Sequence, residues 1–304
     1  MNGVLIIDKP PGLTSHDVVN RVRRILGQRS VGHLGTLDPL ATGVLPLVTG
    51  SLTRLAQFYT TSEKKYEGVV RFGFATDTYD AEGDPAGPAQ SVTLDAQEVR
   101  TLALRFRGAI DQMPPPFSAK KIHGVPAYKL ARKQKEVVLK PVQVEIKEFE
   151  ILEVSADRVS FRARVSSGTY MRSLAHDMGQ HLGCGAHLES LRRSAVAEFE
   201  IADARTLEQL TDAAGKGDIE DLFVHPRKLL PQMPSVTADE GNAARIRSGR
   251  PVNLPELSRA RQVKVFCGQR ELIAIATRVA GTLFHPKIVL VTDTAAQLAS
   301  EKSS

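Results

Sequence analysis

The chain has 304 residues, of which 42% are hydrophobic and 24% are charged. This length suggests about two domains, and the composition is that of a globular protein rather than a disordered or fibrous one. Lys and Arg number 40 against 34 Asp and Glu, so the formal net charge is +6.

The N-terminal region predicts two strands and two helices. An apolar run at residues 4–7 predicts a strand that ends in a Pro- and Gly-rich turn. Ser15 is the expected cap of a helix that ends near Gly27 and repeats apolar side chains on one face: Val18, Val19, Val22, Ile25 and Leu26. The pattern then predicts a loop at residues 32–50, a capped helix at 51–59 and a strand at 66–74.

The middle of the chain carries the surplus of positive charge. Residues 75–91 contain several acids and no base and predict a surface loop, and a helix is predicted at residues 94–106. Residues 119–140 hold seven bases and one acid, Glu136; the bases are Lys120, Lys121, Lys129, Arg132, Lys133, Lys135 and Lys140. Because 33 bases and 33 acids remain elsewhere (40 − 7 and 34 − 1), this segment favours a local anionic partner; a solvated basic face is the alternative.

The second half predicts an α+β fold. Residues 142–154 and 159–165 predict an antiparallel hairpin, followed by helices at 170–182 and 207–214 with a strand at 195–201 between them. A linker is expected at 230–236. Short β-like runs then predict a small β-barrel, at residues 263–266, 272–277 and 288–291. The irregular order of strands and helices before residue 230 favours a mixed sheet.

Several functional classes lack their motifs. The sequence has no GxxxxGK[ST], GxGxxG, HExxH or GxSxG pattern. His181, Cys184 and His187 straddle a predicted helix end, so a packed thiol between ordinary histidines is favoured over a metal site. The acids of residues 77–84 lack calcium-loop spacing. The two cysteines form no CxxC pair, and we expect a cytoplasmic protein without a signal peptide, membrane span, metal or cofactor.

One carboxylate has an unusual setting. Asp38 is the only acid between Asp17 and Glu63, and Leu and Pro residues flank it. An ionised carboxylate in an apolar loop is costly unless a cation or hydrogen-bond donors compensate it. Asp38 is therefore a candidate catalytic residue, and an Asx-Pro turn is the alternative interpretation.

Two further segments supply candidate partners for this carboxylate. Arg172 lies at the start of a predicted helix, and a guanidinium both pairs with a carboxylate and keeps it ionised; a surface arginine is the alternative. Tyr170 lies two residues earlier. Tyr66 stands at a strand start, where an aromatic ring either stacks on a base or fills the core.

These segments resemble the bacterial tRNA pseudouridine synthases of the TruB family. The resemblance covers essentially the whole chain, more weakly at the C-terminal β region. It rests on six blocks in the family's order: residues 5–12, GHLGTLDPLATGVLP at 32–46, KKYEG with TDTYD at 64–68 and 76–80, PFSAKK with AY at 116–121 and 127–128, SSGTYMRSLAHDMG at 166–179, and GAHL to LRR at 185–193.

The resemblance implies both the domain organisation and the activity. It implies a mixed-sheet pseudouridine synthase catalytic domain at residues 1–230, a small PUA-like RNA-binding β-barrel at 231–295 and a tail at 296–304. A basic RNA-clamping insertion would occupy about residues 108–141. The implied reaction isomerises uridine 55 in the TΨC arm of tRNA, in a monomer that uses no guide RNA and no cofactor.

The resemblance also implies roles for individual residues. Asp38 would be the catalytic aspartate, Arg172 its partner, and Tyr66 the tyrosine that contacts the target base and takes part in proton transfer. Tyr170 and Leu191 would wall the pocket.

Other residues would hold the RNA. His33 would stack where the target base is extruded, while Lys9 and Pro10 support the loop that bears Asp38. Within the insertion, the candidate RNA ligands are Lys129, Arg132 and Lys133. Family members often carry Lys where this chain has Ser167, which removes one phosphate contact.

The chemistry suits these residues, because uracil is detached, turned and rejoined through carbon without any redox change. Asp38 either adds to the base ring or acts at the sugar, by attack or proton abstraction, and both routes fit the sequence. Three other functions also fit parts of it. They are a tRNA-folding chaperone, as a separate or an additional role, a guide-RNA-dependent synthase of the dyskerin type, and a basic protein that binds polyanions by charge alone.

Overall fold

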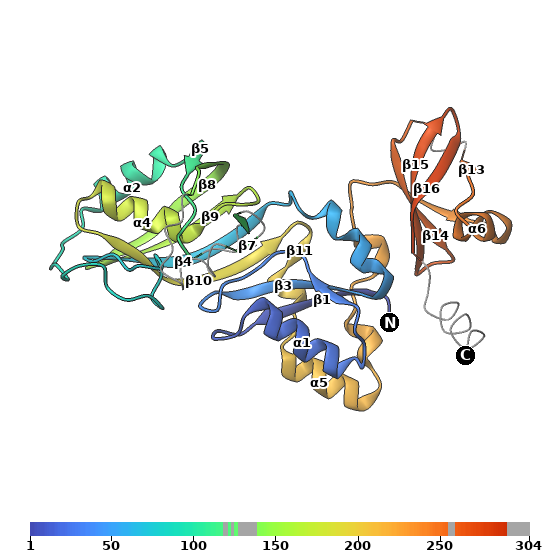
Figure 1. Cartoon of the computed structure of the whole chain (residues 1–304), viewed down its shortest axis with the longest axis horizontal. Coiled ribbons are helices and arrows are strands. Elements are labelled where there is room, and N and C mark those ends of the chain that lie inside the picture. Colours follow the sequence, from blue (N-terminus) through green and yellow to red (C-terminus); the bar gives the residue numbers. More distant parts are fainter. Residues whose placement is uncertain (118–120, 123–124, 127–138, 255–258, 291–304) are drawn as a thin grey trace.

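The computed structural model describes residues 1–117, 121–122, 125–126, 139–254 and 259–290. They form a large mixed sheet with helices and a separate, smaller sheet near the C-terminus (Figure 1). The predicted α+β architecture with a mixed sheet is confirmed.

The large sheet has the strand order β1-β3-β10-β4-β9-β8-β5, with β2 paired to β3 and β11 to β10. The contact between β10 and β3 is parallel, and the other strand pairs are antiparallel. The strands span Gly3–Lys9 (β1), Val31–His33 (β2), Thr42–Thr49 (β3), Lys64–Phe72 (β4), Gly108–Gln112 (β5), Val142–Ser155 (β8), Arg158–Val165 (β9), Ala186–Val196 (β10) and Phe199–Glu200 (β11). The predicted hairpin of β8 and β9 is confirmed.

Helices pack at both ends of this sheet. In Figure 1, α1 and α5 lie beside β1 and β3, whereas α2 and α4 lie at the other end, near β8 and β9. The helices span Ser15–Ile25 (α1), Ala96–Arg105 (α2), Met171–His181 (α4) and Leu207–Lys216 (α5). All four are predicted from the sequence. The segment at 51–59 is helical as predicted, although it is the 3-10 helix η1, Gly50–Phe58; further 3-10 turns are η2 (Ile201–Asp203), η3 (Ile219–Leu222) and η4 (Pro226–Lys228).

The cap of α1 is Thr14 rather than the predicted Ser15. The Thr14 hydroxyl accepts a hydrogen bond from the Asp17 amide at 3.1 Å, and Asp17 Oδ2 accepts one from the Thr14 amide at 2.9 Å. This is a complete capping box. Ser15 is buried, and its hydroxyl bonds to a distant loop instead.

The predicted loop at residues 32–50 is wrong, because β2 ends and β3 runs within it. Side chains of β3 alternate between two hydrophobic clusters, one under α1 and one under η1, so the strand is apolar on both faces. Pro46 is tolerated because its carbonyl accepts from the Leu34 amide at 2.9 Å, on the side away from β1. Its missing N–H lies on that same side and is not needed for the ladder with β1.

The strand predicted at 195–201 is also wrong in extent. Strand β10 covers Ala186–Val196, and a tight reversal at Ala197, with φ of 50°, leads into β11. Strand β10 carries polar and charged side chains such as Glu189, Arg192 and Arg193, which conceal its apolar alternation.

The C-terminal unit is an open sheet within the residues that the structure describes. Its order is β12-β14-β15-β16-β13, and the short helix α6, Glu240–Arg247, packs against it although no helix is predicted there. The strands span Ser235–Ala238 (β12), Val252–Asn253 (β13), Gln262–Cys267 (β14), Glu271–Ala280 (β15) and Leu283–Val289 (β16). Strand β12 begins inside the predicted linker at 230–236.

Polar contacts join the large sheet to the C-terminal unit. Glu198 Oε1 accepts hydrogen bonds from the Tyr59 hydroxyl at 2.6 Å and from the Leu230 amide at 2.9 Å. From the C-terminal sheet, the buried ammonium of Lys264 donates to the Leu229 carbonyl at 2.5 Å. The chain between the sheets is therefore held by side chains from both of them.

Candidate active site

A cavity of about 550 Å³ lies beside the loop at residues 35–41. The beginnings of β4 and β8, strand β10 and the segment that enters α4 form its other walls. Five residues singled out from the sequence line it, from segments far apart in the chain: Asp38, Tyr66, Tyr170, Arg172 and Leu191.

Asp38 and Arg172 form an ion pair in this cavity. Arg172 Nε lies 2.9 Å from Asp38 Oδ2. The arginine side chain is 8% exposed and that of the aspartate 43%, so the cation is fixed in the protein while the carboxylate reaches the open space. The guanidinium favours the ionised form of the carboxylate and orients it.

A second carboxylate, from Asp80, fixes the other side of Arg172. Asp80 Oδ2 lies 3.4 Å from Arg172 Nη1, and its side chain is 4% exposed. Asp80 Oδ1 accepts hydrogen bonds from the Thr78 hydroxyl at 2.6 Å and the Glu82 amide at 3.1 Å. The prediction that residues 75–91 form a surface loop is thus wrong at Asp80, which is buried. Asp80 is the last residue of the TDTYD block at residues 76–80.

Backbone carbonyls complete the setting of Arg172. Nη1 donates to the Thr78 carbonyl at 3.1 Å, and Nη2 donates to the Phe117 carbonyl at 3.0 Å. Every nitrogen of the guanidinium therefore has an oxygen partner. Phe117 belongs to the predicted basic insertion, about residues 108–141, so its carbonyl connects that part of the chain to the arginine that holds Asp38.

Buried polar groups hold the Asp38 loop in place. The Ser15 hydroxyl accepts from the Leu37 amide at 2.8 Å and donates to the Leu37 carbonyl at 3.1 Å. The fully buried Lys9 donates to the carbonyls of Pro10 at 2.9 Å, Leu13 at 2.6 Å and Pro39 at 3.2 Å. Burial lowers the pKa of Lys9 to about 8, and the nearby Asp38 opposes this shift.

The two tyrosines reach the cavity from rigid elements. Tyr66 is 7% exposed and pairs with Ala163 of β9 and Arg193 of β10 in the sheet. Tyr170 is the N-terminal cap residue of α4. The side chain of the buried Gln112 binds the backbone of Tyr170 on both sides: it accepts a hydrogen bond from the Tyr170 amide at 2.8 Å and donates one to the Tyr170 carbonyl at 3.0 Å.

Apart from Ser167, the other residues singled out from the sequence lie outside the cavity lining or outside the described residues. Pro10 follows Lys9, and His33 ends β2; neither lines the cavity. Burial and the charge of Arg193 lower the pKa of His33, so its imidazole is neutral near pH 7. Ser167 lines the cavity. The predicted RNA ligands of the insertion lie outside the described residues: Lys129, Arg132 and Lys133.

The described part of the chain contains no cluster of three or more His, Cys, Asp or Glu side chains able to hold a metal ion. His181 and His187 instead bond through Nδ1 to the carbonyls of Asp177 at 2.8 Å and Phe74 at 3.1 Å. Across the same residues, no helix has the length and apolar character needed to cross a bilayer.

Family models match two consecutive parts of the chain. The model described as "TruB family pseudouridylate synthase (N terminal domain)" matches residues 23–171. The model described as "tRNA pseudouridylate synthase B C-terminal domain" matches residues 172–230. The cavity residues from Asp38 to Leu191 lie within these two matches.

Two curated relatives match over nearly their full length. The tRNA pseudouridine synthase B of Solibacter usitatus (strain Ellin6076) is 51% identical over 294 residues, which cover 95% of this chain and 100% of the relative. That of Azoarcus sp. (strain BH72) is 40% identical and covers 97% and 96%.

Solved structures share the fold. A Cbf5-Nop10-Gar1 complex aligns with a TM-score of 0.71 at 25% identity, over 96% of this chain and 86% of that one. An H/ACA RNP bound to a substrate RNA containing 2'-deoxyuridine aligns with a TM-score of 0.70 at 24% identity, over 95% and 85%.

Proposed function

Because this chain belongs to the TruB family of pseudouridylate synthases, we propose that Asp38 and Arg172 convert uridine 55 in the TΨC arm of tRNA to pseudouridine. The resemblance drawn from the sequence motifs is confirmed at the level of the family. The protein is an isomerase that makes pseudouridine in tRNA, the activity for which its relatives are named. The position of the target and the roles of the residues are the proposal.

The observation that carries the proposal is the ion pair of 2.9 Å between Arg172 and Asp38 at the edge of a walled cavity. The reaction breaks the bond from the sugar to N1 of uracil and forms one to C5, while C5 loses a proton and N1 gains one. No group is lost and no electron acceptor is needed. Asp38 either adds to the base ring or acts at the sugar, and both routes need the ionised carboxylate that Arg172 favours.

The cavity walls serve the step between bond cleavage and bond formation. The detached uracil has to turn in place without leaving the enzyme. Tyr66, Tyr170 and Leu191 form the walls that retain it and exclude water. Tyr66 contacts the base and takes part in the proton transfer.

The target base has to leave its stack before it reaches Asp38. Extrusion costs a few kcal/mol, which stacking on an aromatic or imidazole ring partly offsets. His33 takes this role, and its neutral imidazole suits stacking. Lys9 and Pro10 hold the catalytic loop, while Lys129, Arg132 and Lys133 bind phosphates of the RNA arm.

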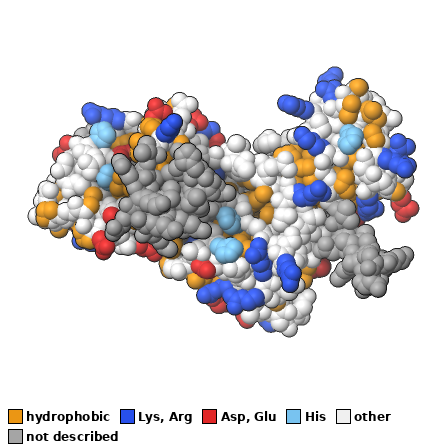
Figure 2. Space-filling view, viewed as in Figure 1, with side chains coloured by type: hydrophobic (Ala, Val, Ile, Leu, Met, Phe, Trp, Pro, Cys, Tyr) orange, Lys and Arg blue, Asp and Glu red, His pale blue; other side chains and the backbone are white. Residues whose placement is uncertain are grey.

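The C-terminal unit acts as a PUA-like RNA-binding domain in this proposal. Residues 231–290 contain nine Lys or Arg and four Asp or Glu, a local surplus of +5 (9 − 4). Lys and Arg side chains gather on this unit on the face shown in Figure 2. Such a surplus attracts the phosphate backbone of tRNA without reading its sequence.

The protein acts in this proposal as a monomer in the cytoplasm, without a guide RNA. The stand-alone form is favoured because the tRNA pseudouridine synthase B of Solibacter usitatus is 51% identical, whereas the matched chain of the Cbf5-Nop10-Gar1 complex is 25% identical. Assistance to tRNA folding is an additional role that the same basic surfaces support.

The test is incubation of the protein alone with an unmodified tRNA transcript, followed by mapping of pseudouridine. We expect one product, at position 55, without added RNA or cofactor. A transcript in which uridine 55 is replaced by cytidine is the matched control. Modification elsewhere in the tRNA would overturn the proposed position, and a requirement for added RNA would overturn the stand-alone form.

A further inference from the structure

A buried cation with no acidic partner stands at one end of the active-site cavity. Arg193 is fully buried in β10. It donates to the carbonyls of Val44 at 2.8 Å, Thr36 at 3.1 Å and Gly35 at 3.1 Å. Among the residues that the structure describes, no carboxylate forms an ion pair with it. A buried charge without a counter-ion is costly, so this arrangement calls for a function.

A second cation faces the same place. Lys64 begins β4 and lines the cavity, and its hydrogen bond to the Ser62 carbonyl, at 2.7 Å, uses one of its three N–H groups. Burial and the charge of Arg193 lower the pKa of Lys64 to about 8, so its ammonium remains mostly charged at pH 7. Two like charges side by side repel each other unless an anion lies between or beside them.

Gly35 leaves the space open between these two cations. A Cβ atom on Gly35 would lie 3.6 Å from Arg193 Nη1 and 3.8 Å from Lys64 Cε. The φ of Gly35 is 125°, a conformation that residues with side chains rarely adopt. The Arg193 guanidinium and the methylene stem of Lys64 therefore border one point that no side chain of residue 35 occupies.

We propose that this end of the cavity, formed by Gly35, Thr60, Lys64 and Arg193 and called the Lys64 site, binds a backbone phosphate of tRNA beside the target nucleotide. The inference rests on the proposed function, since Asp38 lines the same cavity and defines where the target nucleotide enters. Phosphodiesters are the anionic groups of RNA. Lys64 makes the contact, and Arg193 supplies a fixed charge from beneath.

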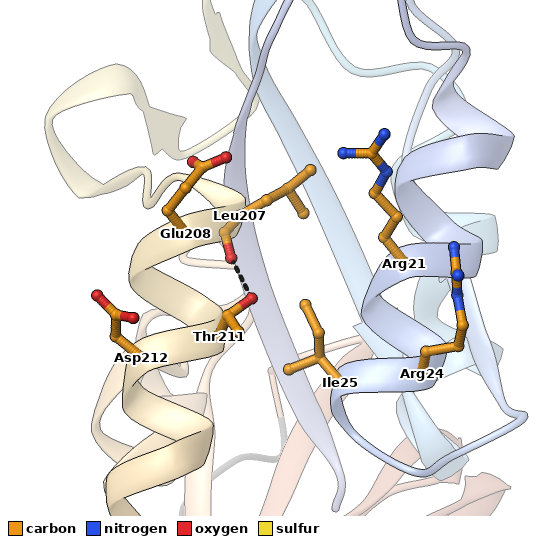
Figure 3. A pocket seen from close by; sticks show the side chains of 7 residues that line it. All are labelled: Arg21, Arg24, Ile25, Leu207, Glu208, Thr211 and Asp212. Carbon is orange, nitrogen blue, oxygen red and sulfur yellow. Dashed lines mark hydrogen bonds between the residues drawn. The ribbon is translucent and has the colours of Figure 1, made fainter.

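A comparison within the molecule supports an anion here. Another cavity, of about 580 Å³, lies between α1 and α5 and includes Arg21, Arg24, Glu208 and Asp212 in its lining (Figure 3). Its lining contains two arginines and two acids, so their formal charges balance. The lining of the active-site cavity instead includes three cations, Lys64, Arg172 and Arg193, and one acid, Asp38, so it carries a surplus of positive charge that a bound anion would offset.

The first test compares the salt dependence of tRNA binding. Lys64→Gln removes the proposed contact, and Lys65→Gln removes the same charge from the next residue, which is exposed on the other face of β4. One phosphate contact contributes about −0.7 to −0.9 to the slope of log K against log salt. Between about 50 and 200 mM salt, wild-type affinity should therefore fall about threefold more than that of Lys64→Gln.

Lys64→Arg is the control that separates the loss of charge from a structural effect of the substitution. It keeps the charge and should restore both the affinity and the salt slope of the wild type. Lys65→Gln should keep the wild-type slope. Equal slopes for Lys64→Gln and wild type, or a wild-type slope lost in both Lys64→Gln and Lys64→Arg, would overturn the phosphate contact.

The second test locates the phosphate. Single methylphosphonate linkages, which are uncharged, replace the phosphates around the target uridine in an RNA stem-loop. At one linkage beside the target, the substitution should weaken binding to the wild type and have no further effect on Lys64→Gln. Additive losses at every position would contradict the proposal. Wild-type pseudouridine formation is measured in parallel, so a failure of the proposed activity is distinguished from a failure of the Lys64 site.

Discussion

The Nε atom of Arg172 lies 2.9 Å from Oδ2 of Asp38, and the arginine is buried while the aspartate is half-exposed. This asymmetry assigns the two residues different tasks. Arg172 is held by Asp80 and by the carbonyls of Thr78 and Phe117, so it is a rigid support for the carboxylate of Asp38. Asp38 has one oxygen on the cation and faces a cavity large enough for a ligand. A carboxylate that is ionised, oriented and accessible is what covalent or proton-transfer chemistry requires.

Asp38→Asn tests the catalytic assignment. The amide keeps the shape of the side chain and loses the charge that attacks or takes a proton. We expect pseudouridine formation to fall by more than about 10³-fold, with the Kd for tRNA changed less than about threefold. Single-turnover mapping and filter binding measure the two quantities. A variant that still turns over at a wild-type rate would remove Asp38 from the chemistry.

Asp80→Asn tests the support behind Arg172. Loss of the ion pair between Asp80 and Arg172, an interaction of about 1.5–3 kcal/mol, should lower kcat about 10- to 150-fold, because Arg172 no longer holds Asp38 in one orientation. The KM for tRNA should stay close to wild type. Asp84→Asn, an exposed acid of the same loop, is the control and should leave kcat unchanged. A larger effect on KM than on kcat would instead place Asp80 in RNA binding.

The proposed catalytic role of Asp38 could be predicted from the sequence. The roles of the residues that hold the site in place, such as Asp80, Gln112 and Arg193, could not. Asp38 is conspicuous because apolar residues surround an acid that has no charged neighbour in the chain. Asp80 lies among other acids, and nothing in its local pattern distinguishes a buried carboxylate from a solvated one. Gln112 and Arg193 bind backbone carbonyls or amides, and such contacts leave no periodic signal in the sequence.

The secondary structure was likewise predictable only where the sequence keeps a clear apolar period. Helices with one apolar face, such as α1 and α4, are readable because the period of 3.6 residues survives in the sequence. Strand β3 is buried on both faces and interrupted by Gly43 and Pro46, so turn signals outweigh its apolar run. It lies between β1 and β10, and β10 comes from a part of the chain far from β3 in the sequence.

Lys9 should make stability depend on pH in a defined window. Its pKa is about 8 in the folded protein and about 10.4 in an unfolded chain. Between these values the unfolded state binds more protons, so the cost of burying the charge disappears as pH rises from about 8 to 10. In Lys9→Met this gain is absent. The difference in unfolding free energy between wild type and variant should change by up to ~1.4 kcal/mol per pH unit. Parallel stability curves from pH 7 to 10 would contradict the shift.

Glu198 should stabilise the joint between the two sheets. Its carboxylate accepts from the Tyr59 hydroxyl and the Leu230 amide, and the low polarity around this pair raises the pKa of Tyr59. Glu198→Ala leaves both donors without an acceptor and should cost about 2–4 kcal/mol of unfolding free energy. Glu198→Gln keeps an acceptor oxygen and should recover at least half of this loss. Denaturant unfolding measures both variants, and equal stabilities for the two would show that the acceptor is not what holds the joint.

The basic insertion should carry a large share of the electrostatic affinity for tRNA. Lys129, Arg132 and Lys133 belong to the segment with a net charge of +6 (7 − 1), and neutralising all three to Gln should weaken tRNA binding. If each contacts one phosphate, the slope of log K against log salt should become less negative by about 2.7. The matched control neutralises three exposed arginines on and after α2: Arg100, Arg105 and Arg107. Because both triples remove the same charge, a general field effect would flatten both slopes equally, whereas direct contact flattens only the first. Equal slopes for the two triples would therefore assign the insertion to a solvated surface, and a selective change would establish it as the clamp on the RNA arm.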